Sequence, residues 1–318
     1  MQRILYLPNA YSQQRQKEKK ANIYPVLLAM QAQYYRNLRH EVHWDNAIGR
    51  YDKIISEPEN LPFLSLPHPD RVFTKAKEFT SGNYKYLPGT HILSASGCWW
   101  GKCSFCVENN KPYEVRPVED VISEIEECRR LGFKEVFDDS ATFPEGEWRL
   151  AYCKQNRRSH IRWSCNLRIA PKTDYFMMRE SGCRMVLFGV ESANQETLDK
   201  INKGVKVEDI IPTIKRAAQC GLEPHIAVMF GYTWETDKDA ERTLKLVHYL
   251  LRKGYAKTAQ ASLYCPPDNI RNETQKKYVK QIYNAAYHLD FWFNKLKDIH
   301  NLDDLKYLWL QIKKGIQR

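Results

Sequence analysis

The sequence predicts an α/β fold built around a partial (β/α)6 barrel over residues 89–265. One observation is that short strand-like runs and helix-period runs alternate six times in this range. Another is that three cysteines, Cys98, Cys103 and Cys106, directly follow the first strand-like run. In parallel barrels the chemistry gathers at the carboxyl ends of the strands, and this cysteine loop would lie at that end. Both observations therefore favour the same fold.

Residues 1–88 begin with the pattern of a βαβ unit. The expected elements are a strand at 3–7, a helix at 24–37, a second strand at 41–44 and a third at 53–56. The helix is expected because apolar side chains such as Val26, Leu27 and Met30 recur at helical spacing. Residues 57–88 contain five prolines and are predicted to form an extended linker.

In the predicted barrel, each strand is a short apolar-rich run followed by an amphipathic stretch. Strands are expected at 91–95, 134–137, 161–165, 184–188, 224–230 and 258–263. Helices are expected at 118–131, 148–156, 174–180, 195–202, 207–220 and 237–251. The first helix has Pro117 and the acidic Glu119 at its start, and Gly132 ends it. Residues 266–318 are predicted to be a helical extension, with helices at 274–295 and 302–316.

The composition excludes several classes of protein. A mean hydropathy of −0.62 and the lack of any long apolar run argue against a membrane span. The apolar segment at the start is too short for a signal peptide, so a cytoplasmic protein is expected. Nine cysteines in 318 residues are too few for a disulfide scaffold, and six of them are scattered as core thiols would be. The net charge of +11 could attract nucleic acid, anionic metabolites or acidic peptides, but it names no substrate.

The three clustered cysteines have the spacing C-x4-C-x2-C. Three thiolates on one short loop can ligate three corners of a [4Fe-4S] cluster and leave the fourth iron open, whereas such clusters normally take four cysteines. A zinc site usually needs four ligands, often in two pairs. The sequence has no second C-x2-C pair, and His91 is the only imidazole nearby. A cluster is therefore favoured, with a zinc site and three unrelated core cysteines as the alternatives.

The loop from Gly97 to Cys106 resembles the signature of the radical S-adenosylmethionine (SAM) enzymes, in which an aromatic residue precedes the last cysteine. Phe105 has that place here. The family signature is C-x3-C-x2-C, and the extra residue makes this loop more similar to the cobalamin-binding-type branch. Residues 39–45 also resemble the second strand of the cobalamin-binding domain of that branch. The Asp-x-His-x-x-Gly loop of that domain is missing, so residues 1–88 are expected to be a truncated Rossmann-like segment and cobalamin is unlikely.

The resemblance implies a radical SAM barrel over residues 89–265 and two cofactors, a [4Fe-4S] cluster on Cys98, Cys103 and Cys106, and SAM on its open iron. It implies reductive cleavage of SAM to a 5′-deoxyadenosyl radical, oxygen sensitivity, and a reducing electron donor such as flavodoxin or ferredoxin. The substrate would be a small molecule, a peptide or a tRNA, and no membrane partner is expected. Two alternatives stay open, a cobalamin-dependent radical methyltransferase and a non-catalytic iron–sulfur or zinc protein that binds nucleic acid.

Polar residues stand near the ends of the predicted strands, where the resemblance implies contacts with SAM. They are Asp138 and Asp139 after the second strand, Asn166 and Arg168 after the third, Glu191 and Ser192 after the fourth, and Lys203 after the next helix. One of the aspartates is expected to face the SAM amino group, and Arg168 suits a carboxylate through its fork of donors. The alternatives are structural: a helix cap, a surface ion pair, and a common helix-terminal charge for Lys203.

The stretch at 228–236 resembles the fifth-strand motif of the family, where apolar and backbone groups hold adenine. Val228 and Phe230 are the expected adenine contacts, and Phe105 is expected to pack near the same ring, with a core role as the alternative. Tyr264 and Cys265 end the sixth strand and would face the cavity, which makes them candidate substrate contacts.

Overall fold

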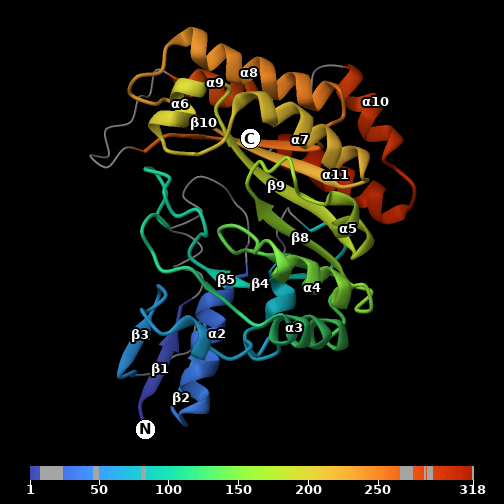
Figure 1. Cartoon of the computed structure of the whole chain (residues 1–318). Coiled ribbons are helices and arrows are strands. Elements are labelled where there is room, and N and C mark those ends of the chain that lie inside the picture. The colour runs from blue at the N-terminus through green and yellow to red at the C-terminus, as the bar shows by residue number, and fades with distance from the viewer. Residues whose placement is uncertain are drawn as a thin grey trace.

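A six-stranded parallel sheet, curled into half of a barrel, forms the centre of the molecule (Figure 1). The computed structural model describes residues 1–7, 24–45, 50–79, 84–265, 275–282, 284 and 289–316. The strands are β4 (Gly89–Ile92), β7 (Glu135–Asp138), β8 (Arg162–Leu167), β9 (Cys183–Glu191), β10 (Glu223–Phe230) and β11 (Thr258–Leu263). They lie in the order β11-β10-β9-β8-β7-β4, and every neighbouring pair is parallel. The predicted α/β fold with a partial six-stranded barrel is confirmed.

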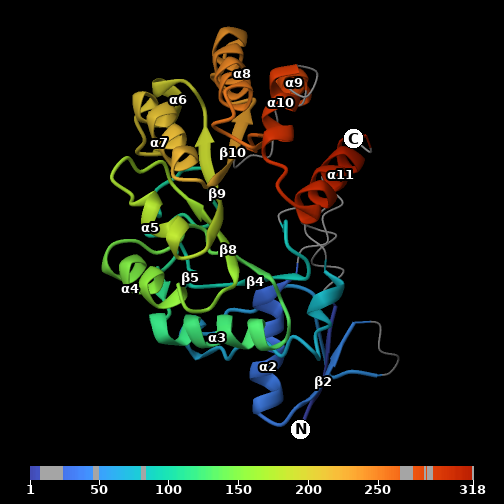
Figure 2. The ribbon, with the colours of Figure 1, turned by 90° about the vertical axis from the view of Figure 1, so that its right-hand side faces the viewer.

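Helices cover the outer face of this sheet, as the two views together show (Figures 1 and 2). They are α3 (Val118–Arg130), α4 (Glu147–Asn156), α5 (Tyr175–Glu180), α6 (Gln195–Lys200), α7 (Val207–Gln219) and α8 (Asp237–Arg252). Alternate residues of β10 show the division between the two faces. Ile226, Val228 and Phe230 are buried in the core shared with the helices, whereas Ala227 and Met229 on the inner face stay partly exposed. The concave face is thus the more open one.

The N-terminal residues form a smaller parallel sheet in the order β2-β1-β3. Its strands are β1 (Arg3–Tyr6), β2 (Glu41–Trp44) and β3 (Lys53–Ile55), and α2 (Val26–Asn37) lies between β1 and β2 in the chain. This unit lies on the side of the half-barrel that carries β4 and α3 (Figure 1). The expected βαβ elements are therefore present over the described residues.

The stretch 57–88 was predicted as an extended linker, but its described residues, 57–79 and 84–88, are instead packed against the barrel. They contain two short 3-10 helices, η1 (Phe63–Ser65) and η2 (Ala76–Glu78). Arg71, Thr74 and Tyr84 of this segment are all at most 3% exposed. The prolines shape the segment, but its buried side chains hold it in place.

Arg71 belongs to a buried ion network that joins this segment to the barrel. Its Nη2 lies 2.6 Å from Glu124 Oε1, and Arg116 Nη1 lies 2.5 Å from Glu124 Oε2. The two arginines also donate to the carbonyl oxygens of His91 and Leu93, at 2.9 and 2.8 Å. Burial acts to raise the pKa of Glu124, but the Arg116 and Arg71 guanidiniums outweigh it and lower the pKa to about 2. One carboxylate thus joins residues far apart in the sequence.

The amino end of the half-barrel is closed by a second ion network and by α11 (Leu302–Ile316). Arg184 pairs with Glu135 at 2.6 Å and with Glu223 at 2.7 Å, and these three residues stand at or near the starts of β9, β7 and β10. Lys85 Nζ lies 2.9 Å from Glu223 and 2.7 Å from Asp304 of α11. The opposite end of the half-barrel, at the carboxyl ends of the strands, carries the cysteine loop.

The C-terminal region differs from the expectation in one respect. The single helix predicted at 274–295 is replaced by α9 (Lys276–Gln281) and α10 (Leu289–Lys297), and part of the predicted span lies outside the described residues. Both helices lie beside α8 (Figure 2). Among the described residues, no helix has both the length and the apolar character needed to cross a membrane.

Candidate functional site

The cysteine loop leaves the carboxyl end of β4 and is closed at its base by a small hairpin. Here β5 (Ala95–Ser96) pairs antiparallel with β6 (Glu114–Val115), so the two ends of the loop are held together. This hairpin was not predicted, because two-residue strands leave no periodic signal in a sequence. It fixes the position of the loop at the end of the barrel where the predicted strand-end residues gather.

Gly97 follows β5 directly and supplies a backbone conformation that the start of the cysteine loop requires. Its φ is +72°, a region that favours glycine, and a Cβ at this position would overlap the carbonyl oxygen of Pro112 on the returning chain. A side chain here would therefore push the two arms of the loop apart. Cys98, the first of the three cysteines, is the next residue.

We expect Gly97→Ala to impair loading of iron while the barrel stays folded. Gly146→Ala is the matched control, since Gly146 has a φ of +67° and no atom lies within 4 Å of the place that its Cβ would take. Both substitutions place an alanine at a positive φ, which costs at least about 1 kcal/mol. Only Gly97→Ala adds the overlap with Pro112, so iron content measured after anaerobic reconstitution should fall in that variant alone. Equal iron content in the two variants would contradict the assignment.

The loop also docks on the segment that follows α6. The backbone N–H of Ser104 donates to the Ile201 carbonyl oxygen at 3.0 Å, and the Trp100 Nε1–H donates to the Asn202 carbonyl oxygen at 2.8 Å. Gly204 packs so closely under the Trp100 ring that a Cβ would overlap it. These contacts bring Lys203 beside the cysteines.

The three cysteines are free thiols that lie near one another. Cys103 is buried, whereas Cys98 and Cys106 are half-buried. Burial raises the pKa of the Cys106 thiol; an N–H from Glu108 opposes this, and the charges of Cys103 and Cys98 add to it. Among the described residues, no three His, Cys, Asp or Glu side chains gather closely enough to hold a single metal ion. Three neighbouring thiols on one loop fit an iron–sulfur cluster by the chemistry of the donor set.

Arg168 lies against the cysteine loop. Its guanidinium is centred 4.5 Å from the Trp100 ring and 5.4 Å from the Trp99 ring. Nη1 lies 3.8 Å from Cys103 Sγ, and Nη2 donates to the Lys203 carbonyl oxygen. A guanidinium at this position can donate to a sulfur atom that ligates a cluster. In this structure Arg168 therefore contacts a predicted cluster ligand.

Glu191 and Lys203 form a buried ion pair beside the same loop. Lys203 Nζ lies 2.7 Å from Glu191 Oε1, and the two residues, Glu191 and Lys203, are only 8% and 6% exposed. Lys203 Nζ also lies 5.9 Å from the centre of the Phe105 ring, next to Cys106. Glu191 has a φ of +63°, which is uncommon for a residue other than glycine. The structure thus brings together two residues that the sequence predicted separately.

Asp138 and its neighbours hold the strand ends together. Asp138 accepts a hydrogen bond from the Ser94 hydroxyl and one of 3.0 Å from the Ser140 N–H, and burial raises its pKa. The Asp139 N–H donates to the Ile92 carbonyl oxygen at 2.9 Å. The Asn166 side-chain amide donates to the Ser140 carbonyl oxygen at 2.9 Å. These residues connect the carboxyl ends of β4, β7 and β8.

Three other predicted contacts lie away from the concave face. The Ser192 hydroxyl is fully buried and accepts from the Asn194 N–H at 3.2 Å. Val228 and Phe230 point into the core shared with the helices, where the Phe230 ring stacks on Tyr278 with centroids 5.8 Å apart. Contact between these two residues and adenine remains a prediction. Because their side chains are in the core, only their backbone atoms could make this contact.

Tyr232 is a residue of the site to which sequence reasoning gave no role. Its side chain is fully buried, and within the described part of the chain its hydroxyl has no hydrogen-bond partner. Burial raises its pKa, and the charge of Glu191 raises it further, so the phenol lies near the buried ion pair. The ring packs 4.9 Å from that of Tyr264 at the end of β11. In the sequence, the feature that could have identified Tyr232 as a site residue is its position directly after Gly231, at the end of a predicted strand.

Glu235 lies in the same loop as Tyr232. Its Oε2 accepts a hydrogen bond of 2.6 Å from the Gly231 N–H, and its Oε1 is buried without a partner among the described residues. Burial raises the pKa of this carboxyl to about 7. Two buried polar atoms in one loop are thus left for a ligand to satisfy.

Comparison with known proteins identifies the family that the barrel region matches. The family model described as "Radical SAM superfamily" matches residues 92–247. The chain is 27% identical over 173 residues to an uncharacterised methyltransferase of Pyrococcus horikoshii. The aligned residues make up 52% of this chain and 38% of that protein. The chain is 25% identical over 288 residues to the bacteriochlorophyllide d C-12(1)-methyltransferase of Chlorobaculum tepidum, covering 83% and 59%. The chain thus spans less than two thirds of the length of these relatives.

A solved structure shares the fold. It is that of the cobalamin-dependent S-adenosylmethionine radical enzyme OxsB with aqua-cobalamin and SAM bound. The match has a TM-score of 0.50 at 12% identity and covers 90% of this chain and 43% of that one. The half-barrel, the three-cysteine loop at its carboxyl end and the family match together show that residues 92–247 form a radical SAM domain.

Proposed function

We propose that the chain is a radical SAM enzyme that holds a [4Fe-4S] cluster through Cys98, Cys103 and Cys106 and cleaves SAM reductively. The observation that carries this proposal is the position of three free thiols on one loop at the carboxyl end of the half-barrel. Such a loop supplies three ligands and leaves one iron for SAM. The bound cluster would supply the electron that breaks a carbon–sulfur bond of the SAM sulfonium.

The chain's own residues then have to hold SAM and shield it from water. The Glu191 carboxylate suits the ammonium group of the SAM methionine part, and the Lys203 ammonium suits its carboxylate. The two side chains pair with each other at 2.7 Å, so they are already held beside Phe105 in the site. Arg168 would donate a hydrogen bond to the Cys103 sulfur. These roles extend the sequence predictions and rest on contacts with the loop.

The test is to reconstitute the protein anaerobically with iron and sulfide, add dithionite and SAM, and identify the nucleoside products by chromatography with mass detection. 5′-Deoxyadenosine is the expected product. The electron paramagnetic resonance spectrum of the reduced cluster should also change when SAM is added. A fully loaded cluster whose spectrum ignores SAM, without any nucleoside product, would favour a non-catalytic iron–sulfur protein.

Methyl transfer is the second candidate function. It is favoured by the names of the two relatives, which are methyltransferases at 27% and 25% identity. The same assay separates the two functions, because a methyltransferase releases S-adenosylhomocysteine. Formation of S-adenosylhomocysteine only when cobalamin is added would favour the cobalamin-dependent reaction and overturn the expectation that cobalamin is unlikely.

We expect Tyr232→Phe to weaken SAM binding by about threefold to tenfold, the usual value of one hydrogen bond. The change removes only the hydroxyl, so the packing against Tyr264 should stay intact. Equilibrium dialysis with the loaded protein measures the SAM dissociation constant. Tyr152→Phe is the matched control, because that hydroxyl is also buried without a partner among the described residues but is surrounded by core aromatics such as Phe143. Unchanged affinity in both variants would remove Tyr232 from the SAM site.

A further inference from the structure

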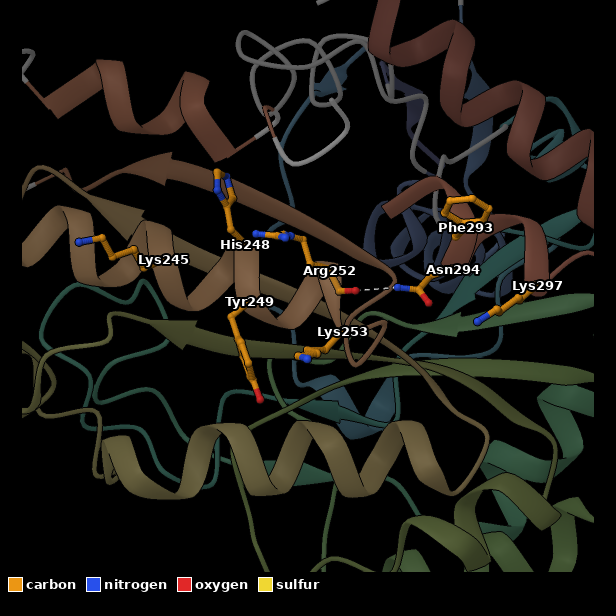
Figure 3. A pocket seen from close by; sticks show the side chains of 8 residues that line it. All are labelled: Lys245, His248, Tyr249, Arg252, Lys253, Phe293, Asn294 and Lys297. Atoms are coloured by element: carbon orange, nitrogen blue, oxygen red, sulfur yellow. Dashed lines mark hydrogen bonds between the residues drawn. The ribbon is translucent and has the colours of Figure 1, made fainter. Parts of the chain in front are cut away.

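A groove of about 750 Å³ lies on the outside of the barrel, between the C-terminal half of α8 and the helix α10. Figure 3 shows side chains from both helices along it and the hydrogen bond of 2.8 Å from the Asn294 amide to the Arg252 carbonyl oxygen. The groove is lined by Lys245, His248, Tyr249, Arg252, Lys253, Phe293, Asn294 and Lys297. None of these residues belongs to the cysteine-loop site.

The lining is strongly basic. Four of its eight residues are lysine or arginine, and none is acidic. Lys245 has Glu241 at 3.8 Å, but both side chains are more than half exposed, so water screens this pair. Lys253 and Lys297 are exposed and have no ion-pair partner in the described part of the chain. Lys253 and Lys297 therefore present positive charge to the groove that no described carboxylate pairs with.

Aromatic rings stand among these charges. Tyr249 on α8 is 40% exposed and Phe293 on α10 is 61% exposed, and both line the groove. Sites for single-stranded nucleic acid combine two features. Cationic side chains bind the phosphate backbone, and the faces of aromatic rings stack on the bases. We propose that this groove binds a single-stranded segment of nucleic acid.

The alternatives fit the lining less well. A membrane-bound helix buries a continuous apolar face, whereas this groove mixes charged and aromatic side chains. An acidic protein surface would satisfy the lysines, but it would not use two exposed rings in a concave site. Nucleic acid uses both features. The proposal does not depend on radical SAM chemistry, because neither the charges nor the rings touch the cysteine loop.

The groove is separated from the cysteine-loop site along the length of α8. Helix α8 starts two residues after Glu235, at the site, and its 16 residues span about 24 Å. The groove lies along the far half of this helix, so a mononucleotide bound there would not reach the site. Only a chain of several nucleotides could occupy both places.

Fluorescence anisotropy with a labelled single-stranded RNA of about 20 nucleotides tests the proposal, with salt varied from about 50 to 200 mM. The wild-type chain should bind with an affinity that falls linearly on a logarithmic salt scale. Lys253→Gln with Lys297→Gln should weaken binding about tenfold or more and reduce the salt slope by about two. Phe293→Ala should weaken it at least about fivefold without changing the slope.

A matched double variant separates the groove from bulk charge. Lys134→Gln with Arg158→Gln removes the same two charges from exposed positions outside the groove. Its affinity should stay within about threefold of wild type, and circular dichroism checks that all variants are folded. Equal losses in both double variants would overturn the proposal. So would competition by poly-glutamate as strong as that by unlabelled RNA, which would indicate an acidic protein as the partner.

Discussion

Serine in place of Cys103 is expected to reduce the iron content to background and to abolish 5′-deoxyadenosine formation. A serine hydroxyl is a poor ligand for iron–sulfur clusters, which select soft thiolates. Cys103 is the buried member of the triad and the one whose sulfur lies beside Arg168. Its loss leaves two thiolates for four irons, so no partial site remains. Iron and sulfide analysis with the product assay measures both effects.

Cys220→Ser is the control for this result. Cys220 is also a free thiol of intermediate exposure, but it caps the C-terminal end of α7 and lies outside the loop. Its replacement should leave iron content and product unchanged. Retained 5′-deoxyadenosine in the Cys103 variant would end the proposed function. Loss in both variants would instead point to general damage to the fold.

The barrel was predictable because its signals are local. Strand and helix periodicity placed the six parallel strands within a few residues, as at β11, where the expected and observed ranges agree at 258–263. The Gly97 to Cys106 loop carried its own signature. The place of the loop followed from the rule that parallel strands present their carboxyl ends on one side. These inferences needed no knowledge of which residues touch across the molecule.

The rest depends on contacts between residues far apart in the chain. Arg168 follows a strand, as expected, but its contact with Cys103 joins residues separated by 65 positions. Glu191 and Lys203 were each predicted, yet nothing in the sequence showed that they pair. Tyr232 was overlooked because an unsatisfied hydroxyl is visible only once its neighbours are known. Side-chain partners of this kind are set by packing, which periodicity does not encode.

Glu124→Gln is expected to destabilise the fold by about 3 to 5 kcal/mol at neutral pH. The change removes the charge that faces Arg71 and Arg116, whose side chains are at most 3% exposed. Arg71 would keep its charge in the interior without an ion-pair partner among the described residues, and Arg116 would keep only its pair with Asp120 at 2.6 Å. Urea unfolding of the two proteins, prepared in parallel with equal iron content, measures the difference in the free energy of unfolding.

The pH dependence of this difference identifies the cause. The pKa of Glu124 is lowered from 4.5 to about 2 in the folded state, so its charged form stabilises the fold by about 3 kcal/mol above pH 4.5. That contribution is lost as the pH falls from 4.5 toward 2, because the carboxyl then becomes as neutral as glutamine. The difference between wild type and Glu124→Gln should therefore narrow below pH 4.5. Glu126→Gln on the same helix breaks only an exposed pair with Arg129 and should cost less than about 1 kcal/mol. A difference that stays constant with pH would mean that packing, rather than charge, makes Glu124 important.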